Sequence, residues 1–518
     1  MASLYIYLSI ALIVALIVHQ RVNGKLKQFP GPFLARWTYL WKFWDTVTGW
    51  HEKPSALRLH RKYGDVVRLG PNTLSFSHPD AIQDIYGVDK HLQKGKYYYV
   101  AAATVNGRVT PSLFSSTDVA WHDNLRRAIQ PAFNLSTLVQ YEPFVNSTIT
   151  TFIGQLDKRF ADKSGKDGVI DLPSWMHWYA FDVIGELTYG QAFGFLESAS
   201  DLDNLLGRTR EFLVYLQSYG QIPWADDLLL KNPLLLWLNQ RGWLNGSPNP
   251  AVPFALKRQI ERIQSRQKAE RRTNDDGRMD LLDKFLAATD KYPETITERE
   301  VLGLGLSMVF AGSESTAISL SSLFYHLLKN PKAYRRLRAE LDERTPQNEK
   351  GSLPQFQTIQ KFPYLDACVK EAFRIHPAAR FSADRVLPPE GATIAGYEVP
   401  GGTVVGMSAW AIHRREDIFG QRVDEYEPKR WLPRDGEAEE KAKVRISEMN
   451  RHAFQFGSGK FNCIGQHISR LEMYKATAAL LMRFDFSLDE PDKNWMLMPG
   501  SFVNVTDVNV RIRRRARE

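Results

Sequence analysis

One ten-residue stretch, FGSGKFNCIG at 456–465, restricts the fold of this chain more than any other. It places Gly457, Gly459 and Gly465 around Cys463, and the 518 residues include only one other cysteine. Glycine admits backbone conformations and close approaches that a Cβ atom forbids. Two distant cysteines form no disulfide framework, which indicates a reducing compartment and a free thiol. A lone cysteine is more often a small buried hydrophobe, but this flanking pattern favours a ligand pressed against a flat cofactor.

The N-terminus is apolar. The first eighteen residues carry no charged side chain and are followed by Arg21, Lys25 and Lys27. As a helix they span about 27 Å, enough for a thin bilayer such as that of the endoplasmic reticulum. A cleaved signal peptide is the alternative, but its basic start and small-residue cleavage site are not visible. The sequence predicts a transmembrane anchor over residues 1–20, with the basic flank on the cytosolic side.

The rest of the chain is expected to form a proline-rich linker, residues 21–50, and one large domain, residues 51–518. In the linker, the prolines of FPGPF remove backbone donors and fix φ. Apolar spacing in the domain predicts mostly helix, and β-branched runs predict small strand regions. The fold class is therefore mainly α with a minor β region. The clearest helices are expected at 255–272, 319–330 and 332–343, and the strands at 65–77 and 392–410.

The net charge of +9 is modest for this length, and acidic residues are interspersed with the basic ones. There is no basic, aromatic-interleaved motif, so we exclude nucleic-acid binding. The charge is compatible with an acidic protein partner.

The cysteine loop resembles the haem-binding loop of the cytochrome P450 superfamily. That resemblance implies a single large haem domain and haem b whose iron has the thiolate of Cys463 as its axial ligand. It implies that Phe456, Gly457, Gly459 and Gly465 also bind the cofactor. The segment after the loop is expected to be helical, so N–H groups at its start would stabilise the negative sulfur.

A second motif tests this resemblance. EAFR places Glu371 and Arg374 three residues apart, on one face of a helix where they can pair. An exposed ion pair is the simpler interpretation. However, PKRW follows later in the chain, and the family adds the arginine of such a segment to the pair. The resemblance therefore implies a buried network of Glu371, Arg374 and Arg430 that supports the haem loop.

A third motif is MVFAGSESTA, which places a glycine, an acid and hydroxyls in an otherwise apolar helix. A tolerated glycine or a helix break is the alternative. It resembles the family's oxygen-activation segment, which implies a catalytic role for Ala311, Gly312, Glu314, Ser315 and Thr316. In that segment the glycine leaves room for dioxygen, and the acid and alcohol relay protons. The family usually has threonine where this chain has Ser315, and serine lacks the methyl group that restricts χ1.

Cations are expected to hold the haem propionates. The segment HDNLRRAIQPAF, residues 122–133, resembles the family helix whose first and fifth residues contact a haem propionate, which implies this role for His122 and Arg126. Four residues apart, they can converge on one anion, and Arg385 matches a further family position. Solvated charges are the alternative for each. Two residues before the cysteine, where the family commonly has arginine or histidine, this chain has Phe461. The other cations must then suffice, because an unpaired buried carboxylate is costly.

The implied activity is oxidation of a lipophilic small molecule by hydroxylation, epoxidation or dealkylation, with O2. Electrons would come from NADPH through a separate cytochrome reductase, with cytochrome b5 as a second donor, because the chain has no flavin or nicotinamide motif. The expected protein is a monomer in the endoplasmic reticulum membrane.

Two segments, 392–405 and 409–420, resemble fungal members of the superfamily, including the pisatin demethylase-like group, and favour secondary-metabolite biosynthesis. By family position the substrate would contact residues 97–109, 309–315 and 378–382, Phe502 and Val503. The alternatives are a detoxifying aromatic hydroxylase or demethylase, a reductase-independent isomerase or dehydratase, and a non-catalytic haem-binding protein.

Overall fold

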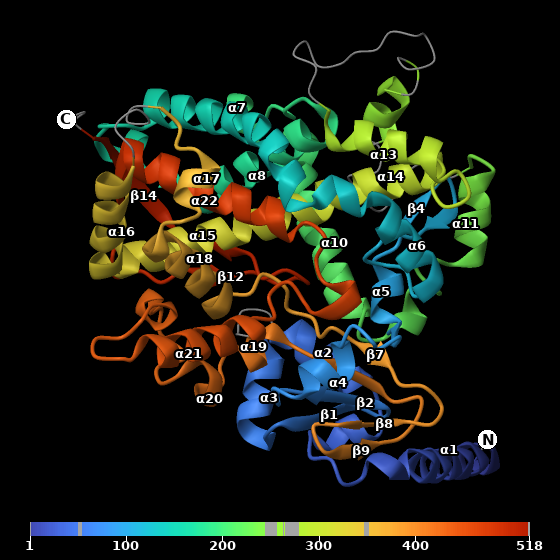
Figure 1. Ribbon diagram of the computed structural model, residues 1–518. Coiled ribbons are helices and arrows are strands. Elements are labelled where there is room, and N and C mark those ends of the chain that lie inside the picture. The colour runs from blue at the N-terminus through green and yellow to red at the C-terminus, as the bar shows by residue number, and fades with distance from the viewer. Residues whose placement is uncertain are drawn as a thin grey trace.

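The computed structural model describes residues 2–49, 54–243, 256–262, 264, 279–345 and 352–515. Figure 1 shows a large helical part and, below it, a smaller part that contains the labelled strands β1, β2, β7, β8 and β9. The N-terminal helix projects beside the β-rich part, and the C-terminus lies at the opposite end of the molecule. The expected class, mainly α with a minor β region, is confirmed.

Helices make up most of the described chain. The longer ones are α1 Ala2–Val22, α2 Leu40–Thr48, α3 Ser55–Tyr63, α6 Val119–Ile129, α7 Leu135–Arg159, α8 Leu172–Tyr189, α10 Leu205–Tyr219, α11 Pro233–Gln240, α13 Leu281–Lys291, α14 Glu298–Ser307, α15 Ser313–Lys329, α16 Pro331–Arg344, α18 Pro363–Ile375, α21 Glu439–Arg451 and α22 Gln466–Arg483. Short helices are α4 Ala81–Tyr86, α5 Tyr97–Val100, α9 Phe195–Ser198, α17 Phe356–Ile359, α19 Ala409–Ile412 and α20 Glu416–Phe419.

The strands form one sheet of five strands and several smaller ones. In the larger sheet the order is β1-β2-β10-β7-β3, with bounds Val66–Gly70, Thr73–Phe76, Val404–Met407, Arg385–Val386 and Gln93–Lys94. A three-stranded sheet orders β11 Phe484–Leu488, β14 Asn509–Arg514 and β6 Ile170–Asp171. The pairs are β4 Ala103–Val105 with β5 Arg108–Thr110, β8 Ala392–Ile394 with β9 Tyr397–Val399, and β12 Met496–Leu497 with β13 Val505–Thr506.

The core of the helical part surrounds one long helix, which comprises α14, a π-helical turn at Met308–Gly312, and α15. It begins with a capping box between Thr297 and Glu300. The helix packs against α8 and α22, and α22 also contacts α7. A Cβ on Gly312 would lie 2.8 Å from Ile184 Cδ1 of α8, so a larger residue here would require the Ile184 side chain to shift. Wide π turns of this kind are frequent at functional sites.

Most of the predicted elements are present. The helices expected at 319–330 and 332–343 lie in α15 and α16, and β1, β2 and β8 to β10 occupy the expected strand regions. The second strand region ends at Met407, because α19 begins two residues later. The structure describes only residues 256–262 and 264 of the helix expected at 255–272, and these are helical. The rest of that prediction lies outside the described residues.

The N-terminal helix α1 is exposed along residues 4–18. Its apolar stretch is Leu4–His19, whereas the described helix with the length and composition to cross a membrane is the buried central one, Glu298–Lys329. The segment assigned to the linker contacts the body: Phe29 is buried, and a Cβ on Gly31 would lie 2.3 Å from the backbone oxygen of Arg68. The boundaries at residues 20 and 50 stay predictions.

Candidate active site

The loop before α22 holds Cys463 in a conformation that depends on two of its glycines. Gly457 and Gly459 have φ of +68° and +65°, in the region that favours glycine. A Cβ on Gly459 would also lie 1.7 Å from the backbone oxygen of Tyr86. The N–H of Cys463 donates to the backbone oxygen of Phe456 at 2.8 Å, which closes the loop. Gly465 has an ordinary φ of −83°, so positive φ does not explain its presence.

Cys463 is exposed, whereas the other cysteine, Cys368, is fully buried in α18. Surrounding protein atoms raise the pKa of the Cys463 thiol, and a hydrogen bond from the Gly465 N–H and the charge of Arg126 oppose the rise. The expected effect of N–H groups near the start of α22 is therefore present, but in the protein alone it is smaller than the effect of desolvation. Ala311, in the π turn of the central helix, is also exposed, although most of that helix is buried.

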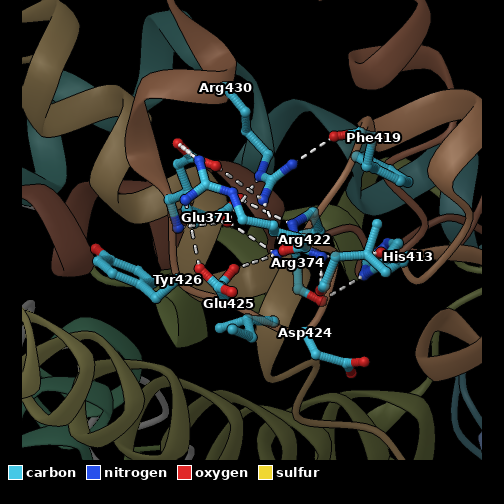
Figure 2. A network of polar contacts seen from close by, with 12 residues as sticks. Glu371, Arg374, His413, Phe419, Arg422, Asp424, Glu425, Tyr426 and Arg430 are labelled. Atoms are coloured by element: carbon cyan, nitrogen blue, oxygen red, sulfur yellow. Dashed lines mark hydrogen bonds and ion pairs between the residues drawn. The ribbon is translucent and has the colours of Figure 1, made fainter.

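The carboxylate of Glu371 is the centre of a buried network (Figure 2). Arg374 donates to both of its oxygens at 2.8 Å, and Arg430 Nε donates to Oε1 at 2.9 Å. Trp431 Nε1 and the backbone N–H of Glu427 donate as well, both at 2.9 Å. Burial alone would raise the pKa of Glu371, but the two guanidinium groups and these hydrogen bonds hold it below its ordinary value. The structure thus brings together the three residues that the sequence placed in this network.

A residue that the sequence did not identify, His413, links this network to the cysteine loop. Arg374 Nη1 donates to the backbone oxygen of His413 at 3.0 Å, and His413 Nδ1 lies 3.2 Å from the backbone oxygen of Arg374. Burial, with the charges of Arg414 and Arg374, lowers the pKa of His413 well below its ordinary value, so its ring is neutral. Its Nε2 accepts from the N–H of Phe454 at 2.8 Å, two residues before Phe456. No sequence spacing relates His413 to the loop.

The hydroxyl and the acid of the central helix lie on different sides of it. Ser315 Oγ donates to the backbone oxygen of Ala311 at 2.7 Å, across the π turn. Glu314 is fully buried and faces His177 of α8 and Asn504, between β12 and β13. Both residues are described, and no hydrogen bond joins their side chains. The expected acid and alcohol are thus adjacent in sequence but are not a bonded pair in this structure.

A second buried acid contacts the same helix. Thr316 is buried and forms a hydrogen bond with Glu472 of α22, a residue that the sequence did not single out. Burial raises the pKa of Glu472 to about 8, although the bond to Thr316 acts in the opposite direction. Its carboxyl group is therefore mainly neutral at neutral pH.

Cationic side chains and a neutral histidine surround the ring of Phe461. Arg385 and Lys94 lie with the guanidinium carbon 4.7 Å and Nζ 4.9 Å from the ring centroid, and the ring of His122 is 4.4 Å away. Arg126 lies close by and donates from Nη1 to the backbone oxygen of Asn462 at 2.7 Å. Burial, followed by the charge of Lys94, lowers the pKa of His122 to about 4, so that ring is neutral.

Lys94 was not identified from the sequence because its neighbours come from strand pairing. Lys94 of β3 lies directly opposite Arg385 of β7, and both side chains are buried. Like charges opposite each other in a sheet repel. Burial and the charges of Arg385 and Arg126 lower the pKa of Lys94 well below its ordinary value. Lys94 Nζ donates to the backbone oxygens of Leu113 and Phe114, and no described carboxylate pairs with it. The cluster is therefore suited to an anionic ligand.

The segments expected to contact substrate meet in an aromatic cluster. The Phe381 ring stacks on Tyr97 with centroids 5.3 Å apart and contacts Tyr98 at 6.2 Å and Phe502 at 6.3 Å. The N–H of Val503, which is fully buried, donates to the backbone oxygen of Ala378 at 2.8 Å. Regions from three distant parts of the sequence are thus adjacent.

Hydrogen bonds through the buried His413 connect the cysteine loop to the Glu–Arg–Arg network, and this arrangement in a mainly helical body fits a haem-thiolate protein. Comparison with known proteins agrees: the family model described as Cytochrome P450 matches residues 30–510. The chain belongs to this family. It is an oxidoreductase of the monooxygenase class whose cofactor is haem ligated by a cysteine thiolate.

Individual relatives extend over nearly the whole chain. The cytochrome P450 monooxygenase cicH of Emericella nidulans is 37% identical over 515 residues, which are 99% of each chain. A cytochrome P450 monooxygenase of Aspergillus terreus is 37% identical over 468 residues, covering 89% of this chain and 91% of that protein. A crystal structure of a cytochrome P450 superimposes with a TM-score of 0.68 over 88% of this chain and 93% of the other, at 19% identity.

Proposed function

We propose that this protein oxidises a lipophilic small molecule in fungal secondary-metabolite biosynthesis, with O2 and with electrons from NADPH delivered by a separate cytochrome reductase. The observation that carries the proposal is the exposure of both Cys463 and Ala311, which are more exposed than the residues next to them in the chain. The curated fungal relatives are named monooxygenases, which supports the same reaction class.

The residues present fit a haem group. Cys463 would ligate the iron, and the buried cations Lys94 and Arg385, together with the half-buried Arg126, would hold the propionates. A thiolate-ligated haem supplies the activation of dioxygen. In this assignment Phe461 does not pair with a propionate itself; its ring face stabilises two of the cations that do.

The protein's own residues would orient the substrate and control protons. Ser315 has its hydroxyl fixed beside the π turn by the bond to Ala311, where it can pass a proton toward the side on which dioxygen binds. The aromatic cluster of Tyr97, Phe381 and Phe502 would contact the substrate and exclude water. An apolar, aromatic lining suits a lipophilic compound.

We further propose that α1 anchors the protein in the endoplasmic reticulum membrane as a monomer. The exposure of its apolar side chains supports this proposal, because such a surface is unfavourable in water. Deletion of residues 2–22 should move the protein from the membrane fraction to the supernatant while leaving the carbon monoxide spectrum of the reduced protein unchanged.

The function is tested by reconstitution of the full-length protein with a reductase and candidate lipophilic metabolites. Substrate-dependent NADPH consumption and a product heavier by one oxygen atom, or dealkylated, are expected. Turnover without NADPH would favour the isomerase or dehydratase, and absence of turnover under every condition would favour a non-catalytic haem protein. Product analysis would separate a biosynthetic role from detoxifying hydroxylation.

Two lysines near the Phe461 ring provide a test of the haem assignment and its matched control. Lys94 and Lys460 both approach the Phe461 ring, at 4.9 and 6.0 Å, but Lys460 also pairs with Asp123 at 2.8 Å. Lys94→Met should speed haem loss to a haem-binding acceptor protein, and at the same time should stabilise the haem-free protein by removing a buried charge repulsion. Lys460→Met should do neither. Unchanged haem loss in Lys94→Met would contradict the role of Lys94.

A further inference from the structure

His177 and Glu314 form an isolated ion-pair contact beside the central helix. The two side chains come from α8 and α15, and they are 1% and 0% exposed. The distance from His177 Nε2 to Glu314 Oε2 is 3.5 Å. Among the described residues, neither His177 Nε2 nor Glu314 Oε1 has a hydrogen-bond partner. Buried polar atoms are rarely left in this state, so the pair calls for a chemical explanation.

The proton count of the pair follows from the partners of the imidazole. His177 Nδ1 lies 2.8 Å from the backbone oxygen of Pro173. A carbonyl oxygen can only accept, so Nδ1 carries a proton and donates it. Nε2 then presents either a second N–H or a lone pair to Glu314. A lone pair facing an ionised carboxylate in a buried site would leave two acceptors opposed without a donor. One further proton must therefore lie on the pair.

The groups around Glu314 favour its charged form. Burial raises the pKa of Glu314, but the charge of His177, the amide of Asn504 and the charge of Arg210 outweigh burial and bring the pKa below its ordinary value. Asn504 Nδ2 donates to Oε2 at 3.0 Å, and Arg210 approaches from α10. From α22, Glu472 contacts the same helix at Thr316 and is mainly neutral. The surroundings of Glu314 therefore favour its carboxylate form.

We propose that His177 is a positioning residue for the acid of the active site: as an imidazolium it holds Glu314 as a carboxylate against α8, away from Ser315. When the proton moves, the Nε2–H bond breaks and an O–H bond forms on Glu314, leaving a neutral imidazole and a carboxylic acid. The charge attraction that fixes the acid is then lost. The acid is free to turn toward the side of the helix that carries Ser315. This inference rests on the proposed monooxygenase function.

The proton count can be measured without turnover. In the full-length, haem-loaded protein as its reduced carbon monoxide complex, ¹⁵N-histidine NMR reports the charge of His177. The infrared difference between the wild type and Glu314→Gln reports whether Glu314 is ionised. We expect an imidazolium and a carboxylate. A neutral imidazole facing an ionised carboxylate would overturn the proposal, and so would a charged imidazole facing a protonated acid.

Substitution of His177 tests the positioning role. His177→Phe removes both the charge and the donor, and His177→Gln removes only the charge, so the infrared carboxylic-acid band of Glu314 should appear in both variants. Product formed per NADPH should fall about tenfold, less than the roughly hundredfold or more that direct general acid–base catalysis contributes. Unchanged product yield with an ionised Glu314 in His177→Gln would overturn the proposal.

His60→Gln is the matched control. His60 is also a buried helical histidine whose Nδ1 lies 2.8 Å from a backbone oxygen four residues away, that of Gly64. Its Nε2 lies 2.8 Å from Ser75 Oγ instead of an acid. This variant should leave the product yield and the Glu314 band unchanged. If the wild type shows no NADPH-dependent turnover, the proposed function fails, whereas the spectra still decide the state of the pair.

Discussion

Glu371 and Glu314 are both fully buried carboxylates, but their surroundings differ sharply. Glu371 accepts five hydrogen bonds, from Arg374, Arg430, Trp431 and the backbone of Glu427. Among the described residues, Glu314 accepts one hydrogen bond, from Asn504, and its Oε1 accepts none. Two guanidinium groups and several hydrogen bonds keep Glu371 charged. The charged form of Glu314 is supported mainly by His177, with smaller contributions from Asn504 and Arg210.

This difference distinguishes a buried charge that stabilises the fold from a buried charge that can take part in turnover. A carboxylate with both oxygens satisfied gains rigidity, and its loss takes away the acidic partner of Arg374 and one of the two acidic partners of Arg430. A carboxylate with a free oxygen can change its proton and its rotamer at low cost. We therefore expect substitutions at Glu371 to affect folding and haem loading, and substitutions near Glu314 to affect turnover.

The largest effect is expected for Glu371→Ala. Removal of one partner from a buried ion network costs about 3–5 kcal/mol. Because His413 links the network to the cysteine loop, little haem-loaded protein should be recovered. The measurements are haem content per protein and the denaturant midpoint.

Glu425→Ala is the control for that variant. Glu425 belongs to the same region, and its backbone oxygen accepts from Arg374, but its side chain is 61% exposed and, among the described residues, pairs only with Arg422 at the surface. The free energy of unfolding should change by less than about 0.5 kcal/mol. Normal haem incorporation in Glu371→Ala would refute the structural role of the network.

The next effect is expected for Glu314→Gln. The amide keeps the size of the side chain and can donate a hydrogen bond to a neutral His177, so haem loading and the unfolding midpoint should change much less than in Glu371→Ala. Product formed per NADPH should fall roughly a hundredfold if the acid moves protons. A large loss of stability with preserved product yield would remove the contrast between the two glutamates.

Ser315→Ala should have a smaller effect on turnover. It removes the hydroxyl beside the π turn and should lower product per NADPH about tenfold, while Ser315→Thr should retain it. Ser321→Ala is the control, because Ser321 makes the same bond to a backbone oxygen four residues earlier, Ala317 at 2.7 Å, further along α15. Unchanged coupling in Ser315→Ala would assign proton delivery elsewhere.

The smallest effect concerns Glu472 and pH. Burial raises the pKa of Glu472 to about 8, above the value of about 4.3 for an unfolded glutamate. Between these values the folded state binds more protons than the unfolded state, so the free energy of unfolding should fall as pH rises. Urea unfolding of the wild type should show this slope more strongly than Glu472→Gln. An identical slope in both would contradict a neutral Glu472.

Helical spacing made part of the site predictable. Glu371 and Arg374 lie one turn apart, so their pairing could be expected before any fold was known. The positive φ of Gly457 and Gly459 likewise agrees with the expectation drawn from the loop. Such patterns have limits. Gly465 has an ordinary φ, so the loop pattern does not explain it. Glu314 and Ser315 are neighbours in the sequence but contact different partners, because helix geometry alone does not tell which neighbour a side chain faces.

The sequence by itself determined the fold class, the family, and the local motifs whose members lie within one turn or one loop. Tertiary structure decided the partners across elements: Lys94 opposite Arg385, His413 against Phe454, and His177 against Glu314. The physical reason is distance along the chain. Backbone geometry fixes contacts over three or four residues, whereas contacts between remote strands and helices depend on how the whole core packs.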